Sequence, residues 1–182
     1  MKFLTYEFEN AESVGVMSKD LTCIYPLSAM GLTYSSMQEI IQEITDEERK
    51  QISHYVERGC EKSIPYSQVK RLSPIPRFRR DMICIGYNFK SHAEEIAQLR
   101  GESTASAAVS YPIYFVKRTY EATGDGGEIP YKKGYAENLD CGVEVAVVIG
   151  KDALNVSEDR MEDYIFGYTI ANDLCDTRIN KV

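Results

Sequence analysis

The chain has 182 residues, 43% of them hydrophobic and 27% charged, which is ordinary for a globular protein long enough to bury a core. Its formal net charge of -7 argues against general nucleic-acid binding, because phosphate backbones require a basic surface. No stretch approaches the ~20 apolar residues of a membrane helix, and the first residues lack a hydrophobic signal region. The cysteines are odd in number, which argues against a disulfide framework. We therefore expect a cytoplasmic protein that binds neither nucleic acid nor membrane.

Residues 1–71 are predicted to form a small N-terminal α/β domain. Its predicted elements are two short strands and two amphipathic helices, each helix opened by a capping box: Phe3–Phe8, Gly15–Met17, a helix beginning at Ser35–Gln38, and a helix from Thr45–Glu48 that stops at Gly59. His54 lies in the second helix, where a surface position is expected. Nothing in this region indicates a site.

Residues 72–182 are predicted to form a second region after a proline-rich linker at Leu72–Pro76. The predicted elements are, in chain order, strand Met82–Gly86, a helix capped by Ser91 and ending near Gly101, strand Tyr111–Val116, strand Val143–Ile149, a helix capped by Ser157, and strand Phe166–Ala171. The small polar residues 101–110 are predicted to form a mobile loop. The mixture of elements predicts an α+β fold.

A glutamate stands inside the most apolar of these strands. Val143–Ile149 is rich in β-branched residues and is predicted to be buried on both faces, so an ionised and unpaired Glu144 would be costly. A metal ion, a basic partner or escape at the sheet end would offset that cost. Asp173 adjoins another apolar strand, and two carboxylates converging at one sheet end would bind a hard divalent cation. A snorkelling Glu144 and a loop-capping Asp173 explain the residues equally well.

Three further residues are candidates for chemistry. His92 and Glu95 are three apart on a predicted helix, which places them on one face as a potential proton-transfer pair. From these residues alone, an incidental histidine beside a solvated acid is the favoured interpretation. Lys117 closes an apolar strand, where a solvated strand end is more usual than a contact with a substrate carboxylate.

Taken together, these segments resemble the fumarylacetoacetate hydrolase family. The matching motifs follow the family's order: Ile83–Phe89 with Ser91–Glu95 resembles its strand, turn and His-x-x-Glu helix, Pro112–Lys117 its Pro-x-x-Phe-x-Lys strand, Leu139–Lys151 its Glu-x-Glu strand, and Phe166–Asp173 its Phe-Gly-Tyr-x-x-x-Asn-Asp segment. The resemblance covers about residues 72–178 and, more faintly, the N-terminal region.

The resemblance implies a mixed β-roll or sandwich fold, usually dimeric, that uses Mg²⁺ or Mn²⁺ to act on oxo-acids. Members cleave carbon–carbon bonds of oxo-acids, decarboxylate them or carry out enol–keto isomerisation, with the metal stabilising an enolate. Carried over residue by residue, the metal ligands are Glu144 and Asp173 and the acid–base pair is His92 and Glu95. The substrate-binding residues are Lys117, Tyr87 and Asn88.

Two departures from the family pattern bear on activity. Gly142 stands where the first glutamate of Glu-x-Glu is expected, so one carboxylate is missing and weak metal binding is predicted. Asp140 shares that strand face but lies about 7 Å further along, which makes it a secondary candidate ligand. The chain also resembles only the first half of a complete family core, which predicts either a homodimer or a companion chain that supplies the other half.

Three hypotheses follow for the function. The first is a metal-dependent hydrolase, decarboxylase or isomerase of oxo-acids, with activity reduced by Gly142 and the short core. The alternative is a non-catalytic or truncated binding or assembly subunit derived from the same family. The third is an α+β domain whose motif matches are accidental, which the ordered run of matches disfavours.

Overall fold

The computed structural model describes residues 1–99, 101, 111–136 and 138–176. The chain forms two compact units, one built from Met1–Pro76 with Thr123–Val182 and the other from Arg77–Ala122. The domain boundary predicted between residues 71 and 72 stays a prediction. The loop predicted at residues 101–110 lies, apart from Gly101, outside the described residues.

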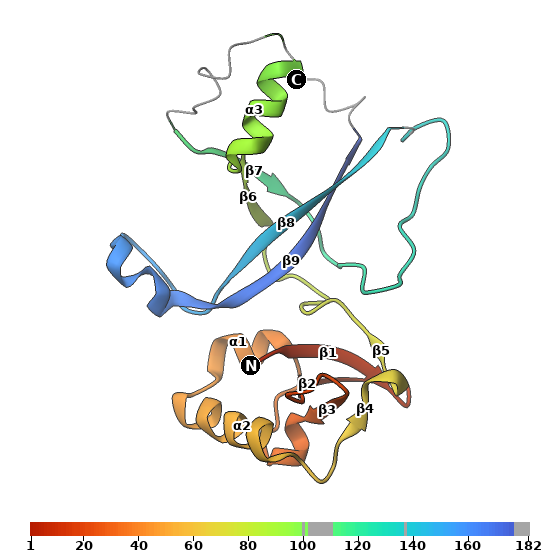
Figure 1. The fold of residues 1–182 in the computed structure, drawn as a ribbon, viewed down its shortest axis with the longest axis vertical. Coiled ribbons are helices and arrows are strands. Elements are labelled where there is room, and N and C mark those ends of the chain that lie inside the picture. The colour runs from red at the N-terminus through yellow and green to blue at the C-terminus, as the bar shows by residue number, and fades with distance from the viewer. Residues whose placement is uncertain (100, 102–110, 137, 177–182) are drawn as a thin grey trace. The chain divides into compact units, whose positions relative to one another are not determined.

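The N-terminal region is a five-stranded antiparallel sheet in the order β4-β3-β2-β1-β5, with helices α1 and α2 beside it (Figure 1). Glu9 and Asn10 both have positive φ angles, as a tight two-residue hairpin turn requires. The bounds are β1 Phe3–Phe8, β2 Ala11–Met17, β3 Cys23–Pro26, β4 Ile64–Pro65, β5 Lys70–Arg71, α1 Met37–Glu43 and α2 Asp46–Arg58. The two predicted strands and two predicted helices are present, whereas β3, β4 and β5 were not predicted.

The core of this region lies between the helices and the sheet. Its buried members come from the strands, the short 3₁₀ helix Leu27–Met30 and the loop after it, and both α-helices: Val14, Val16, Tyr25, Leu27, Met30, Leu32, Met37, Ile40 and Ile52. Thr45 caps α2 with the predicted capping box, in which its hydroxyl accepts from the Glu48 amide. The cap of α1 is Ser36 rather than Ser35, because the Ser35 hydroxyl donates to Glu39 instead.

The second part of this unit is a long antiparallel hairpin of β8 (Leu139–Ile149) and β9 (Ile165–Asp176), visible in Figure 1. The Phe166 ring connects it to the N-terminal core, 5.6 Å from the Phe3 ring centroid and below the Arg49 guanidinium. The segment before β8 packs closely as well, since a Cβ on Gly124 would lie 2.9 Å from the Arg71 carbonyl oxygen. Connections on both sides therefore tie the hairpin to the first 76 residues.

Two expectations for this hairpin are wrong, and the helix expected after Ser157 is present but of another type. Val143–Ile149 is not buried on both faces, because Val145 is 62% exposed and the burial alternates along the strand. Asp173 lies inside β9 rather than beyond its end, because pairing with β8 continues to Asp176. The segment after Ser157 is a 3₁₀ helix, Glu158–Tyr164, and the Ser157 side chain makes no capping hydrogen bond.

The second unit pairs β6 (Met82–Gly86) with β7 (Ile113–Lys117) and carries helix α3 (Lys90–Leu99). The helix begins before the predicted cap, since the Ala93 amide already donates to the Phe89 carbonyl. Ala93 and Ala97 form its buried side. In the part of the chain that the structure describes, no helix has the length and hydrophobicity needed to cross a bilayer.

Candidate functional site

His92 and Glu95 form a contact pair on the first turns of α3. Nδ1 of His92 lies 3.7 Å from Oε2 of Glu95, and the two side chains are 56% and 69% exposed. The predicted three-residue spacing therefore does bring the imidazole and the carboxylate together on one helix face. Because both groups are open to solvent, a substrate can reach them, and the carboxylate can orient the ring or share its proton.

The turn between β6 and α3 places an aromatic ring against this pair. Tyr87 adopts a left-handed backbone conformation with φ 54°, and its ring stacks on the His92 imidazole with centroids 6.2 Å apart and planes inclined by 19°. Asn88, the next residue, is exposed. Sequence patterns do not predict this stacking, since Tyr87 and His92 are five positions apart and only the turn conformation brings their rings together.

Lys117 lies away from this turn along the strand ladder. It pairs with Met82 at the start of β6, whereas the turn follows Gly86, which pairs with Ile113. Four residues of antiparallel strand span about 14 Å. Within this unit Lys117 is thus at the opposite end of the ladder from Tyr87, and its role in holding a substrate stays a prediction.

In the other unit, Glu144 and Asp173 come together on one face of the β8–β9 hairpin. Gly142 pairs directly with Asp173, and Glu144 lies two residues along on the same face. A Cβ built on Gly142 would be 3.6 Å from Oε1 of Glu144 and 3.9 Å from Cβ of Asp173. The absence of a side chain at Gly142 therefore leaves space that borders both the Glu144 carboxylate and Cβ of Asp173.

Burial differs between the carboxylates of this face. Glu144 and Asp173 are half-buried, and Oδ1 of Asp173 is shielded from solvent. Asp140 is exposed and pairs with Cys175, two residues beyond Asp173. Among the described residues no group of three or more His, Cys, Asp or Glu side chains is placed to hold a metal ion. Glu144 and Asp173 are therefore the two candidate ligands on this face, and Asp140 does not serve as a third.

This pair fits a hard divalent cation of the Mg²⁺ type. Mg²⁺ in proteins is commonly held by one or two carboxylates, with water and substrate oxygens completing its octahedral shell. Carboxylate oxygens suit Mg²⁺ and Mn²⁺ better than softer ions. The missing glutamate at position 142 lowers the negative charge of the site and favours weak binding. Glu144 and Asp173 are the residues that would hold the ion.

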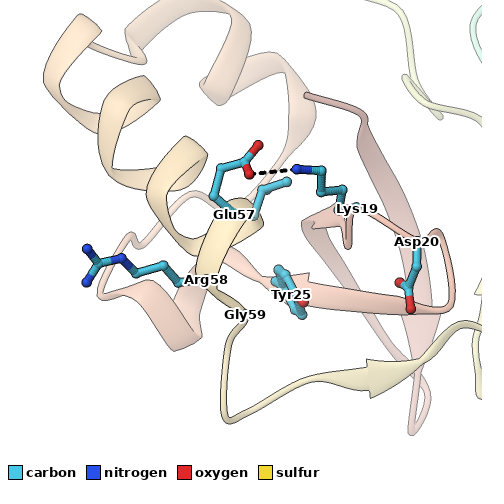
Figure 2. Close-up of a pocket in the computed structure, with 7 residues that line it drawn as sticks. Lys19, Asp20, Tyr25, Glu57, Arg58 and Gly59 are labelled. Atoms are coloured by element: carbon cyan, nitrogen blue, oxygen red, sulfur yellow. Dashed lines mark hydrogen bonds and ion pairs between the residues drawn. The ribbon is translucent and has the colours of Figure 1, made fainter.

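A separate hollow of about 420 Å³ lies in the N-terminal region, lined by the turn between β2 and β3, by Tyr25 of β3 and by the end of α2 (Figure 2). An ion pair between Lys19 and Glu57, 2.8 Å long, lies beside it, and the hydrogen bond from this pair raises the pKa of Lys19. The residues of the predicted site are not among those that line it. Because the two charges cancel and both side chains are largely exposed, the hollow offers no arrangement for catalysis.

The sequence matches a known family over most of the second region. Residues 81–181 match the family described as fumarylacetoacetate (FAA) hydrolase C-terminal, which is more than half of the chain. The chain belongs to the fumarylacetoacetate hydrolase family. Oxaloacetate tautomerase YisK of Bacillus subtilis is 34% identical over 115 residues, which are 63% of this chain and 36% of that protein.

Other relatives are similar over nearly the whole chain. An uncharacterized protein of Staphylococcus haemolyticus is 27% identical over 98% of this chain and 60% of its own length. The solved fumarylacetoacetate hydrolase of Exiguobacterium antarcticum is 20% identical with a TM-score of 0.65, and it covers 100% of this chain but 58% of its own. The chain thus spans about three-fifths of these relatives and has the fold of part of a family core. The predicted family and fold are confirmed.

Proposed function

We propose that this protein is a metal-assisted enzyme of oxo-acids, and that its reaction is enol–keto isomerisation. The observation that carries the proposal is the placement of Glu144 and Asp173 on one face of the hairpin, both beside Gly142. The choice of reaction is supported by the 34% identity to an oxaloacetate tautomerase, and carbon–carbon cleavage is the alternative within the same family. A bound Mg²⁺ or Mn²⁺ would act as a Lewis acid that stabilises the enolate form of the substrate.

The chain's own residues would supply positioning and proton transfer. In enol–keto isomerisation one proton leaves the enol oxygen and one is added to the neighbouring carbon, so no co-reactant is needed. The His92 imidazole can accept and donate such a proton, and Glu95 at 3.7 Å would orient it. Glu144 and Asp173 would hold the cation, and Asn88 and Lys117 are the proposed substrate contacts.

Turnover of oxaloacetate tests this function. The purified chain is assayed with Mg²⁺ or Mn²⁺ for loss of enol absorbance and, separately, for release of pyruvate. We expect enol–keto turnover that stops on chelation and falls by about 10²–10⁴-fold in His92→Ala. His54→Ala is the matched control, because His54 lies on α2 in the N-terminal region. Turnover that survives both chelation and His92→Ala contradicts the proposal, and pyruvate release alone redirects it to cleavage.

A second candidate is a non-catalytic subunit that assembles with other chains. Gly142 favours it, because the glycine removes one carboxylate from the metal site. The outward face of the β8–β9 hairpin favours it as well, since Val145, Tyr168 and Ile170 are largely exposed there. A homodimer or a companion chain stays a prediction. Sedimentation of the purified chain, alone and mixed with a full-length relative, distinguishes a monomer from either assembly.

A further inference from the structure

Tyr87 holds an uncommon backbone conformation directly before the helix that carries His92. Its φ of 54° is left-handed, which bulky residues avoid because Cβ crowds the following carbonyl oxygen. Such strain persists only where the surroundings enforce it, and it is frequent at functional sites. The residue lies between Gly86, which ends β6, and Lys90, which begins α3. The conformation reverses the chain there and determines where the ring points.

The ring points at the imidazole of His92. The planes are inclined by only 19° at a centroid distance of 6.2 Å, within the range of stacked aromatic pairs. Tyr87 is half-buried, whereas the His92 side chain is 56% exposed. A largely exposed imidazole therefore has a half-buried aromatic ring stacked beside it, and the left-handed turn sets the position of that ring.

We infer that Tyr87 is a positioning residue for His92. An exposed histidine on the first turns of a helix otherwise samples several rotamers, and each differs in where the two ring nitrogens lie. Stacking on one face restricts the ring to orientations that keep Nδ1 toward Glu95, at 3.7 Å, and leaves Nε2 for a substrate. The catalytic consequence rests on the proposed function, whereas the stacking itself does not.

This role differs from the substrate contact that the family resemblance implies for Tyr87. A substrate contact acts through binding, so its loss raises KM. A positioning residue acts through the geometry of proton transfer, so its loss lowers kcat with little change in KM. The hydroxyl is dispensable for stacking, because the ring face makes the contact. Tyr87→Phe therefore keeps the positioning function, whereas Tyr87→Leu removes it.

Proton NMR of the histidine rings tests the stacking without any assay of activity. The chain has only two histidines, and His54 provides an internal control because Tyr55 meets it edge-on, at 6.5 Å and 87°. Protons above an aromatic face are shifted upfield by its ring current. We expect the His92 Cε1 proton to move downfield in Tyr87→Leu, to stay in place in Tyr87→Phe, and to be unaffected by Tyr55→Leu. A His92 signal that is unchanged in Tyr87→Leu overturns the inference.

Kinetics then test the consequence. With oxaloacetate and Mn²⁺ we expect kcat to fall by about ten- to a hundredfold in Tyr87→Leu at similar KM, with recovery in Tyr87→Phe. A rise in KM at unchanged kcat overturns the positioning role in favour of a substrate contact. Tyr87→Asn, which tolerates the left-handed conformation, repeats both measurements if the leucine variant does not fold. If the wild-type chain shows no turnover, the proposed function fails while the NMR result still decides the stacking.

Discussion

The first 76 residues and the β8–β9 hairpin differ in how far their apolar side chains are buried. The N-terminal sheet buries its apolar face under α1 and α2, so that Ile40 is 0% exposed. The hairpin presents valine, isoleucine and tyrosine outward, and Ile170 is 74% exposed. The N-terminal region thus has a complete core of its own. The hairpin depends on side chains such as Phe166 for its attachment and leaves its other face uncovered by the described residues.

The largest difference in stability is expected when an isoleucine is replaced by alanine in each of the two regions. Ile40→Ala removes a fully buried side chain and is expected to lower the free energy of unfolding by about 2–5 kcal/mol. Ile170→Ala removes an exposed one and should change it by no more than about 0.5 kcal/mol. Denaturant titration followed by circular dichroism measures both. A comparable loss in Ile170→Ala would show that the outer hairpin face is covered in solution.

Two glycine substitutions should change the free energy of unfolding in opposite directions. Gly15→Ala places a Cβ 2.8 Å from the Tyr25 carbonyl oxygen, and the forced backbone shift is expected to destabilise the protein by about 1–3 kcal/mol. Gly142→Ala places a Cβ at ordinary contact distances of 3.5 Å and more, so the stiffer unfolded chain should stabilise the protein by about 0.4–1 kcal/mol. Thermal unfolding of both variants is the measurement. Destabilisation by Gly142→Ala would contradict the inference that a Cβ fits at that position without displacing its neighbours.

The two capping residues provide a smaller contrast. Thr45→Ala removes a complete capping box from α2 and is expected to cost about 1 kcal/mol of stability. Ser157→Ala should cost less than about 0.5 kcal/mol, because the Ser157 side chain makes no capping hydrogen bond. Denaturant titration measures both variants. Equal losses of stability would contradict the claim that Thr45 caps its helix through a side-chain hydrogen bond and Ser157 does not.

The smallest expected effect is a pH dependence of the stability of the N-terminal region. Hydrogen bonds from Thr45 and from the Tyr34 hydroxyl hold the pKa of Glu48 below its ordinary 4.5, and burial raises the pKa of Tyr34 to about 12. The lowered pKa of Glu48 contributes stability above pH 4.5 that is lost as pH falls through its folded value. The raised pKa of Tyr34 contributes stability below pH 10 that is lost as pH rises toward 12.

Amide hydrogen exchange in α2 across this pH range measures the effect. Protection should decline at both extremes, and Glu48→Gln should weaken the acid-side decline. Glu57→Gln is the control, because Glu57 pairs with Lys19 outside the cap. An acid-side decline that Glu48→Gln leaves unchanged would contradict the role of the cap.

The sequence predicted features that depend on neighbours along the chain. The α2 capping box, the strand positions and the spacing of His92 and Glu95 are local, and the structure has all of them. It mispredicted the burial of Val143–Ile149, because β-branched composition reports strand preference and not whether a second layer covers each face. The stacking of Tyr87 on His92 was missed because it depends on a left-handed turn in a residue that rarely adopts one.

The convergence of Glu144 and Asp173 was predicted as one of two equal interpretations; the strand register places both residues on one face, and their role as metal ligands stays a prediction. Gly142 pairs with Asp173, which puts the two carboxylates on one face as diagonal neighbours. Strand register depends on long-range pairing that a single sequence does not reveal. The family motifs identified the residues, and the register explains why a glycine between them leaves room for both side chains.

Calorimetric titration of the purified chain with Mn²⁺ tests the proposed two-carboxylate site most directly. We predict weak binding at one site, its loss in Asp173→Asn and in Glu144→Gln, and tighter binding in Gly142→Glu, which restores a third carboxylate on the same face. Asp140→Asn is the matched control and should bind much as the wild type does. Binding that persists unchanged in both Asp173→Asn and Glu144→Gln would contradict the account.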